Sequence, residues 1–183
     1  MANIPNYVAD NISLGPAILY VGAVGTTPTL DVGAIAEDGM EFNVSREFLE
    51  VNQGSPKVLI KQFVTGETVE LTCNTIEWNL TNLAYALGTG VTSSSASQDT
   101  FAFGADPGTD EVAVHVRHSL PSGHTISIYM WRAQPTGEWN MSMAQDELHT
   151  FPFSFKALQA TTAWDGSALA VGQQLFKIVR FKQ

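Results

Sequence analysis

Cysteine is nearly absent from this chain, because Cys73 is its only thiol. A single cysteine cannot form an intrachain disulfide, so a disulfide-stapled scaffold is excluded. Cys73 falls on the apolar face of a predicted strand, and we expect it to be a small buried hydrophobe. Residues 1–6 carry neither a basic region nor an apolar core, so no secretory signal is predicted and folding in a reducing cytoplasm is expected.

Charge is also scarce, at 15% of residues against ~25% in typical soluble domains. Lysine and arginine number only 9 against 18 acidic residues, which gives a net charge of −9. Without a basic stripe, the chain is not expected to grip nucleic acid or an anionic membrane. No apolar run approaches the length needed to span a bilayer. A surface with so little charge is often covered by other subunits.

The chain lacks a catalytic or cofactor-binding motif, so we expect no enzyme activity, no cofactor and no metal. His115 and His118 are three residues apart on a predicted strand, which places them on opposite faces rather than around one metal ion. Surface histidines are therefore expected. Glu47 and Glu70 could form a carboxylate pair on adjacent strands, but no aromatic cleft is recognisable around them and the glycosidase signal is very weak.

What is present is a succession of short segments that alternate apolar and polar residues, separated by Gly and Pro turns. Residues 112–117 and 151–156 are the clearest examples, and residues 173–181 predict a last strand. Residues 16–22 are apolar on both faces and predict a strand buried on both sides. The expected fold is all-β with one flanking helix, an antiparallel sandwich or barrel that forms a single domain over residues 1–183.

The one helical segment spans residues 79–88. Asn79 suits the N-cap and Gly88 suits the C-terminal stop. The apolar stripe expected to pack on the sheet contains Leu80, Leu83, Ala84 and Leu87. Residues 1–14 are interpreted as an irregular N-terminal arm. Residues 89–110, rich in serine at their start, are interpreted as a flexible loop insertion.

The longest pattern is a projecting hairpin over residues 40–64. Its rising arm is residues 40–52, its turn is residues 53–56 and its returning arm is residues 57–64. Thr65 and Gly66 then pivot the chain into a further strand at residues 67–74. Alternation gives this pair of strands one packed face and one wet, acidic face. The predicted wet face includes Glu41, Asn43, Glu47, Glu70 and Thr72.

Near the hairpin turn, apolar residues point both ways. The residues concerned are Phe48, Leu49, Val51, Val58, Leu59, Ile60 and Phe63. A projecting hairpin cannot cover both of its own faces, so the pattern predicts an assembly element in an oligomer. The alternative is that this tip lies inside a larger monomeric sandwich.

The order of these features resembles the tail tube, or major tail, proteins of tailed bacteriophages. The resemblance runs through residues 30–35 with the acidic glycine bend after them, the long hairpin and the strand opened by Thr65-Gly66-Glu67. It continues through the leucine-rich helix that ends at Gly88 and the late strand at residues 151–157. It covers most of the chain, and residues 89–110 depart from it.

The resemblance implies a structural virion protein of the phage tail, assembled in the host cytoplasm. Six copies would close a ring, and rings would stack into a hollow tube. Further copies of the chain, the tape-measure protein and tail initiator and terminator proteins are the implied partners. The acidic face would line the lumen, where it would repel the phosphate backbone so that DNA passes without specific binding. The apolar tip would be clamped between subunits or rings.

A carbohydrate-binding or other surface-recognition β-sandwich is the alternative function. Trp131, Trp139 and Trp164 could offer stacking faces to a sugar, although core or interface packing is the commoner role of tryptophan. A small hydrolase that uses carboxylates is a third and weaker hypothesis.

Overall fold

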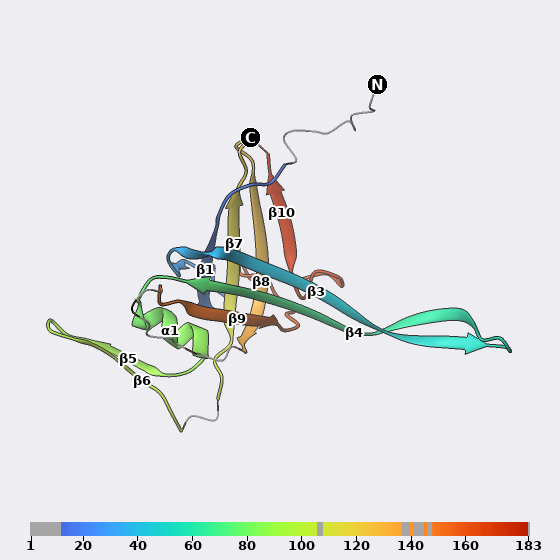
Figure 1. Cartoon of the computed structure of the whole chain (residues 1–183), viewed down its shortest axis with the longest axis horizontal. Coiled ribbons are helices and arrows are strands. Elements are labelled where there is room, and N and C mark those ends of the chain that lie inside the picture. Colours follow the sequence, from blue (N-terminus) through green and yellow to red (C-terminus); the bar gives the residue numbers. More distant parts are fainter. Residues whose placement is uncertain (1–11, 106–107, 137–139, 141–144, 146–147, 183) are drawn as a thin grey trace.

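A computed structural model describes residues 12–105, 108–136, 140, 145 and 148–182 of the 183-residue chain. The described residues form ten strands and one helix (Figure 1): β1 (Ala17–Ala23), β2 (Leu30–Asp31), β3 (Ile35–Gln53), β4 (Val58–Thr75), α1 (Leu80–Leu87), β5 (Val91–Ser94), β6 (Asp99–Ala102), β7 (Val112–Ser119), β8 (Thr125–Pro135), β9 (Phe151–Ala157) and β10 (Lys177–Phe181). This confirms the all-β fold class with one helix. In the described part of the chain, no helix has the length and apolar character to cross a membrane.

The strand β8 joins two layers of one antiparallel sheet. One edge of β8 pairs with β7, whereas its other edge pairs first with β10 and then, from Ala133 to Pro135, with β9. The sheet order is β2-β1-β7-β8-β9-β4-β3, with β10 also on β8. Figure 1 shows β9, β4 and β3 running across β7, β8 and β10, so the sheet folds over itself around a shared core.

Alternate residues of the strands fill this core, as the sequence predicts for half-buried strands. Its most buried members are Leu19, Val21, Val69, Leu71, Val112, Val114, Met130, Phe153 and Phe155. Full burial of each large side chain stabilises the fold by about 1.5–3 kcal/mol. Cys73 is buried in the same cluster, as expected. Its burial, with a smaller contribution from the negative charge of Asp38, raises the pKa of the thiol to about 12.

The first strand differs from its prediction. β1 buries Leu19 and Val21 but leaves Ile18 exposed, so the prediction of burial on both sides was wrong. The second hydrophobic cluster of the molecule centres on Trp131 of β8 and does not cover Ile18.

The helix α1 has the predicted caps. The Asn79 side-chain oxygen accepts a hydrogen bond from the Thr81 N–H at 2.9 Å, and Gly88 ends the helix with a φ of 66°. A Cβ at Gly88 would also lie 2.5 Å from the Thr109 side chain, so only glycine fits.

The buried stripe of α1 was predicted only in part. Leu83 is buried as expected, together with Asn82 and Ala86, whereas Leu80, Ala84 and Leu87 are only partly buried. Asn82 faces inward because its side-chain amide donates to the Val32 carbonyl at 2.8 Å. That hydrogen bond satisfies a polar group in the interior and fixes the rotation of the helix.

Aromatic side chains occupy the outer face of β1, β7 and β8. Trp131 and Trp164 meet edge to face at 5.1 Å, and Trp131 donates its indole N–H to the Gln173 carbonyl at 2.9 Å. This is the packing role that tryptophan was expected to prefer, whereas Trp139 lies outside the described residues. His115 stacks between the rings of Tyr20 and Tyr129, at 5.6 Å and 4.9 Å. The expectation of a surface histidine was therefore wrong for His115.

Two segments were assigned the wrong secondary structure. The serine-rich stretch expected to be a loop forms the hairpin β5–β6, in which Val91 pairs with Ala102 and Thr92 with Phe101. Its β-branched and aromatic residues favour strands more than its serines oppose them. The last strand begins at Lys177 rather than at Gln173. The carbonyls of Gln173 and Gln174 accept bonds from Trp131 and Ala160 instead of joining a ladder.

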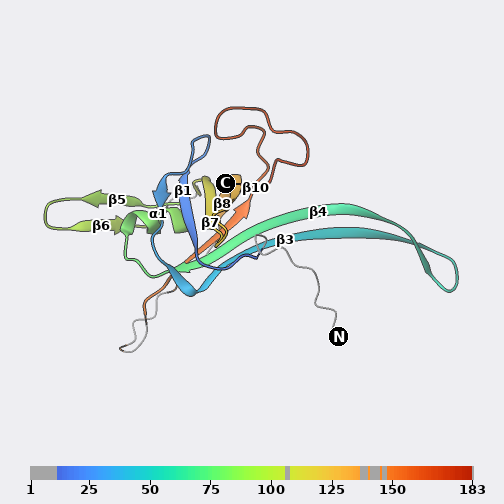
Figure 2. The same ribbon diagram turned by 90° about the horizontal axis from the view of Figure 1, so that it is seen from above.

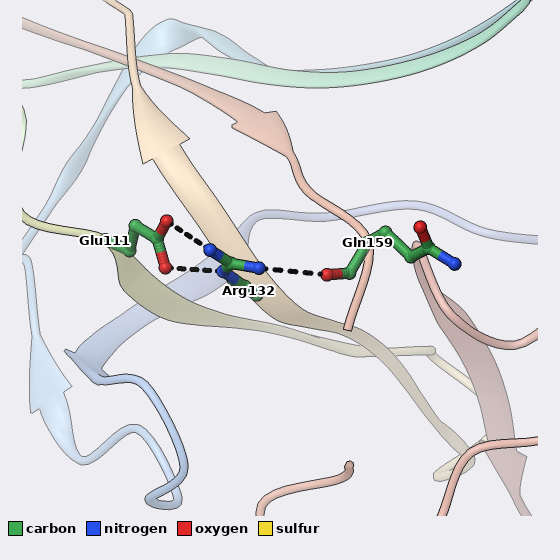
Figure 3. A network of polar contacts seen from close by, with 3 residues as sticks. All are labelled: Glu111, Arg132 and Gln159. Carbon is green, nitrogen blue, oxygen red and sulfur yellow. Dashed lines mark hydrogen bonds and ion pairs between the residues drawn. The ribbon is translucent and has the colours of Figure 1, made fainter. Parts of the chain in front are cut away.

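An ion pair joins Glu111, which precedes β7, to Arg132 of β8, and Arg132 also bonds to the segment after β9 (Figure 3). The Arg132 guanidinium donates through Nε and Nη2 to the Glu111 carboxylate at 2.5 Å and 2.6 Å, and through Nη1 to the Gln159 carbonyl at 3.3 Å. The paired geometry holds the pKa of Glu111 below its ordinary value. Both side chains are partly exposed, so the pair fixes geometry more than it adds stability.

Candidate assembly surfaces

The hairpin β3–β4 extends far beyond the body of the molecule and curves away from it (Figure 2). Every residue from Asn43 to Thr65 is exposed within this chain. The turn occupies residues 54–57, one residue later than predicted. The alternative that the tip lies inside a monomeric sandwich was wrong, because no part of the described chain covers it.

A β-bulge divides the hairpin into two parts. Glu47 pairs with Gly66, whereas the next residue, Phe48, pairs with Val64, so Thr65 has no partner in the ladder. The pivot predicted at Thr65 and Gly66 is therefore a bulge within one continuous strand, β4. A second register shift after Val51 leaves Ile60 as an extra residue. Bulges bend a strand and increase its twist, which accounts for the curvature of the hairpin.

Below the bulge, one face of the hairpin is polar. Glu41 pairs with Thr72, Asn43 with Glu70, and Glu47 with Gly66. The register thus brings together the residues predicted for the wet face, namely Glu41, Asn43, Glu47, Glu70 and Thr72. Gly66 leaves room for its partner, because a Cβ there would lie 3.2 Å from a carboxylate oxygen of Glu47.

This polar face, which we call the acidic face, continues onto β9. Ser154 pairs with Thr72 and Lys156 pairs with Glu70, and the Lys156 ammonium lies 3.8 Å from the Glu70 carboxylate. The position of Lys156 on this face was not predictable from the sequence, because the paired strands β4 and β9 are far apart in the chain. Lys156 partly neutralises Glu70, whereas no ion pair is found in the described structure for Glu41 or Glu47.

Above the bulge, apolar side chains lie on both faces. Leu49 and Phe63 pair on the face that carries Glu47, and Phe48 and Val64 pair on the opposite face. The residues predicted for an interface are 40–63% exposed: Phe48, Leu49, Val51, Val58, Leu59, Ile60 and Phe63. Val44 and Val64 are about half exposed as well and extend the same surface. We call residues 48–64 the hairpin tip.

Charge at the hairpin tip differs from that of the rest of the chain. The tip carries Lys57 and Lys61 against the single acid Glu50. Lys61 places its ammonium 4.6 Å from the centre of the Phe63 ring, and Glu50 accepts a hydrogen bond from Gln62 at 3.0 Å. The tip is therefore an apolar surface with a net positive charge in a chain whose net charge is −9.

A second apolar surface lies at the opposite end of the molecule. A groove of about 1070 Å³ is lined by residues of α1 and β6 and by Trp78 and Phe103, and we call it the helix groove. Its apolar lining consists of Trp78, Leu80, Leu83, Leu87, Phe101 and Phe103, and its acidic residue is Asp99. Trp78 and Phe103 are 53% and 62% exposed. The groove was not predicted, because the serine-rich composition of residues 89–110 indicates a loop. The apolar residues Val91, Phe101 and Phe103 are the signal in this stretch that could have indicated it.

The family model described as phage tail tube protein matches residues 12–168 of this chain. The match includes the whole long hairpin, α1, and every strand except β10. A search among curated proteins gave no match.

Proposed function

Since the chain belongs to the phage tail tube protein family, we propose that it self-assembles into hexameric rings that stack into the hollow tube of a phage tail. The protein is a structural component of the tail, and the proposal concerns how its copies associate. The observation that carries it is the hairpin tip, which projects from the body with exposed apolar side chains on both faces. Apolar surface of this extent on a projecting element requires a covering partner.

The magnitudes favour repeated contacts over a single pair. Nine aliphatic or aromatic side chains between Val44 and Val64 are about half exposed, and covering each would contribute about 1 kcal/mol. Association costs about 4–15 kcal/mol in lost translational and rotational freedom. A single tip contact would therefore give an isolated pair of copies little or no net binding free energy. In a closed ring every copy both provides and receives such a contact, and stacking adds further ones.

The acidic face is proposed to line the lumen. Glu41 and Glu47 would place negative charge along the path of DNA, and Glu70 would do so to the extent that Lys156 leaves it unbalanced. Like charge keeps the phosphate backbone from binding the wall, so DNA can slide through the tube. The tape-measure protein would occupy the same lumen before DNA passes.

The remaining partners and the site of assembly follow from the same proposal. Initiator and terminator proteins of the tail would set where the tube begins and ends. Assembly would take place in the cytoplasm of the host, and the finished tube would reside in the virion.

Negative-stain electron microscopy of the purified chain, together with light-scattering mass across a concentration series, tests the proposal. We expect hollow tubes or six-membered rings, with an average mass that rises with concentration. A ring of another symmetry would correct the subunit number alone. A monomer that persists at all concentrations, even with tail initiator protein added, would contradict self-assembly and redirect the search to carbohydrate ligands.

A further inference from the structure

We propose that the helix groove receives the hairpin tip of the next copy of this chain. This inference rests on the proposed function, since it presupposes self-assembly, and it assigns the surface on which the tip docks. The occupant is thus a second copy of the same chain, and the interface joins two different surfaces.

The positions of the two surfaces suit a repeating contact. The hairpin tip lies at one end of the long axis of the molecule, and α1 and β6, whose residues line the helix groove, lie toward the other end (Figures 1 and 2). A tip therefore cannot fold back into the groove of its own chain. A contact between unlike surfaces leaves each dimer with one free tip and one free groove, so it continues until a ring closes or a helical array grows.

The shapes correspond as well. The tip is a two-stranded ribbon with Leu49 and Phe63 on one face and Phe48 and Val64 on the other. A flat surface would cover one of these faces, whereas a groove with two walls covers both. The helix groove has such walls, since Leu83 and Leu87 come from α1 and Phe101 comes from β6. Its volume of about 1070 Å³ lies at the upper end of the range of binding pockets, which suits several large side chains.

Charge points to the same partner. Asp99 is the charged residue in the lining of the groove, and residues 76–105 contain no lysine or arginine. The tip contributes Lys57 and Lys61. Charges at the rim of an interface mainly select the partner and the register, and here they favour the tip over the acidic remainder of a second copy.

Cysteine cross-linking of assembled protein tests the contact. A chain with Ile60→Cys and Phe103→Cys is expected to form, with a short bis-maleimide, a ladder of covalent oligomers. The matched control combines Ile60→Cys with Val171→Cys, a position that is 95% exposed and outside the groove, and is expected to give no ladder. Dimers from Phe103→Cys alone would show that grooves pack on grooves and would overturn the inference.

Charge reversal gives a second measurement. Lys61→Glu and Asp99→Lys should each lower the association constant about fivefold at low salt, and the double variant should recover most of that loss. Lys61→Glu combined with Asp31→Lys is the control that should not recover.

Failure of the inference and failure of the proposed function have different signatures. Tubes that form normally, yet show neither a ladder nor a charge rescue, would overturn the groove as the docking surface and leave self-assembly intact. A wild-type chain that never assembles would overturn both.

Discussion

Leu49 lies directly opposite Phe63 in the long hairpin, on the same face as Glu47, which lies opposite Gly66. One face of a single ribbon thus changes from acidic to apolar within two residues, and the change coincides with the bulge at Thr65. In the proposed assembly this change would let the distal part of the hairpin pack against protein while the proximal part faces water. We therefore expect substitutions on the two sides of Thr65 to have separable effects.

Ile60→Asp should abolish assembly while the domain stays folded. Ile60 is 57% exposed, so the new carboxylate costs little in the isolated chain, where surface substitutions change stability by about 0.5 kcal/mol or less. In the assembly the charge would be desolvated without a partner, which is far more costly. Sedimentation should show monomers, and circular dichroism should show an unchanged melting curve. Val171→Asp, which adds the same charge on a fully exposed side chain, should assemble normally. Normal polymerisation of Ile60→Asp would show that the tip is not an interface.

Glu47→Lys should leave assembly intact and make the tube retain DNA. The substitution changes the charge of the acidic face by +2 per copy, and repeated lysines along a narrow wall attract phosphate groups. Co-sedimentation of short double-stranded DNA with assembled tubes measures the effect, which should weaken steeply as salt is raised. Glu37→Lys is the control with the same net charge, because Glu37 lines a depression that contains none of the five residues predicted for the acidic face. Equal retention by both variants would indicate a net-charge effect and count against the lumen assignment.

Local chemistry predicted the elements that depend on neighbours in sequence. The helix begins after Asn79 and ends at Gly88, because the Asn79 side chain accepts a hydrogen bond from the first turn and Gly88 adopts the left-handed conformation that ends a helix. Alternation identified the faces of the hairpin, since the period of a strand is two residues. The family resemblance supplied the function class, which no single residue of the chain indicates by itself.

The pairing of strands that are far apart in the sequence could not be predicted from local residue patterns. Nothing near β8 in sequence indicates that one of its edges is shared by β9 and β10. Lys156 reaches the acidic face only through that arrangement. His115 lies between two tyrosines because β1 and β8 both flank β7. The sequence of β7 alone does not indicate which strands are its neighbours.

His115 should make the chain less stable at mildly acidic pH. Burial between Tyr20, Tyr129 and Trp164, with a smaller effect of the Arg117 charge, lowers the pKa of the imidazole from its ordinary 6.5. As the pH falls below that value, the unfolded chain takes up the proton first, so the free energy of unfolding decreases until the folded pKa is passed.

His115→Phe keeps a ring in the stack and removes the titration. Urea unfolding at pH 7.5 and pH 5.5 should show a smaller loss of stability in His115→Phe than in the wild-type chain. The same loss in both proteins would assign the pH dependence to other groups.

Cys73 should be inert in the folded chain and reactive once it unfolds. Burial raises the pKa of its thiol from 9.0 to about 12, so the thiolate fraction at pH 8 falls roughly a thousandfold. Maleimide should therefore label Cys73 slowly in buffer and quickly in concentrated urea. Ile60→Cys, whose side chain projects into solvent in the unassembled protein, should take up one label at once under the same conditions.

Rapid labelling of Cys73 in the native chain would mean that β4 separates readily from β9, because Phe153 and its neighbours otherwise shield the sulfur. That outcome would bear on assembly as well. β4 is continuous from Cys73 to the hairpin tip, so a strand that detached from β9 would not hold the tip in a fixed direction. A slow native rate, by contrast, indicates that β4 stays docked on β9 and can present the tip to the next copy in one orientation.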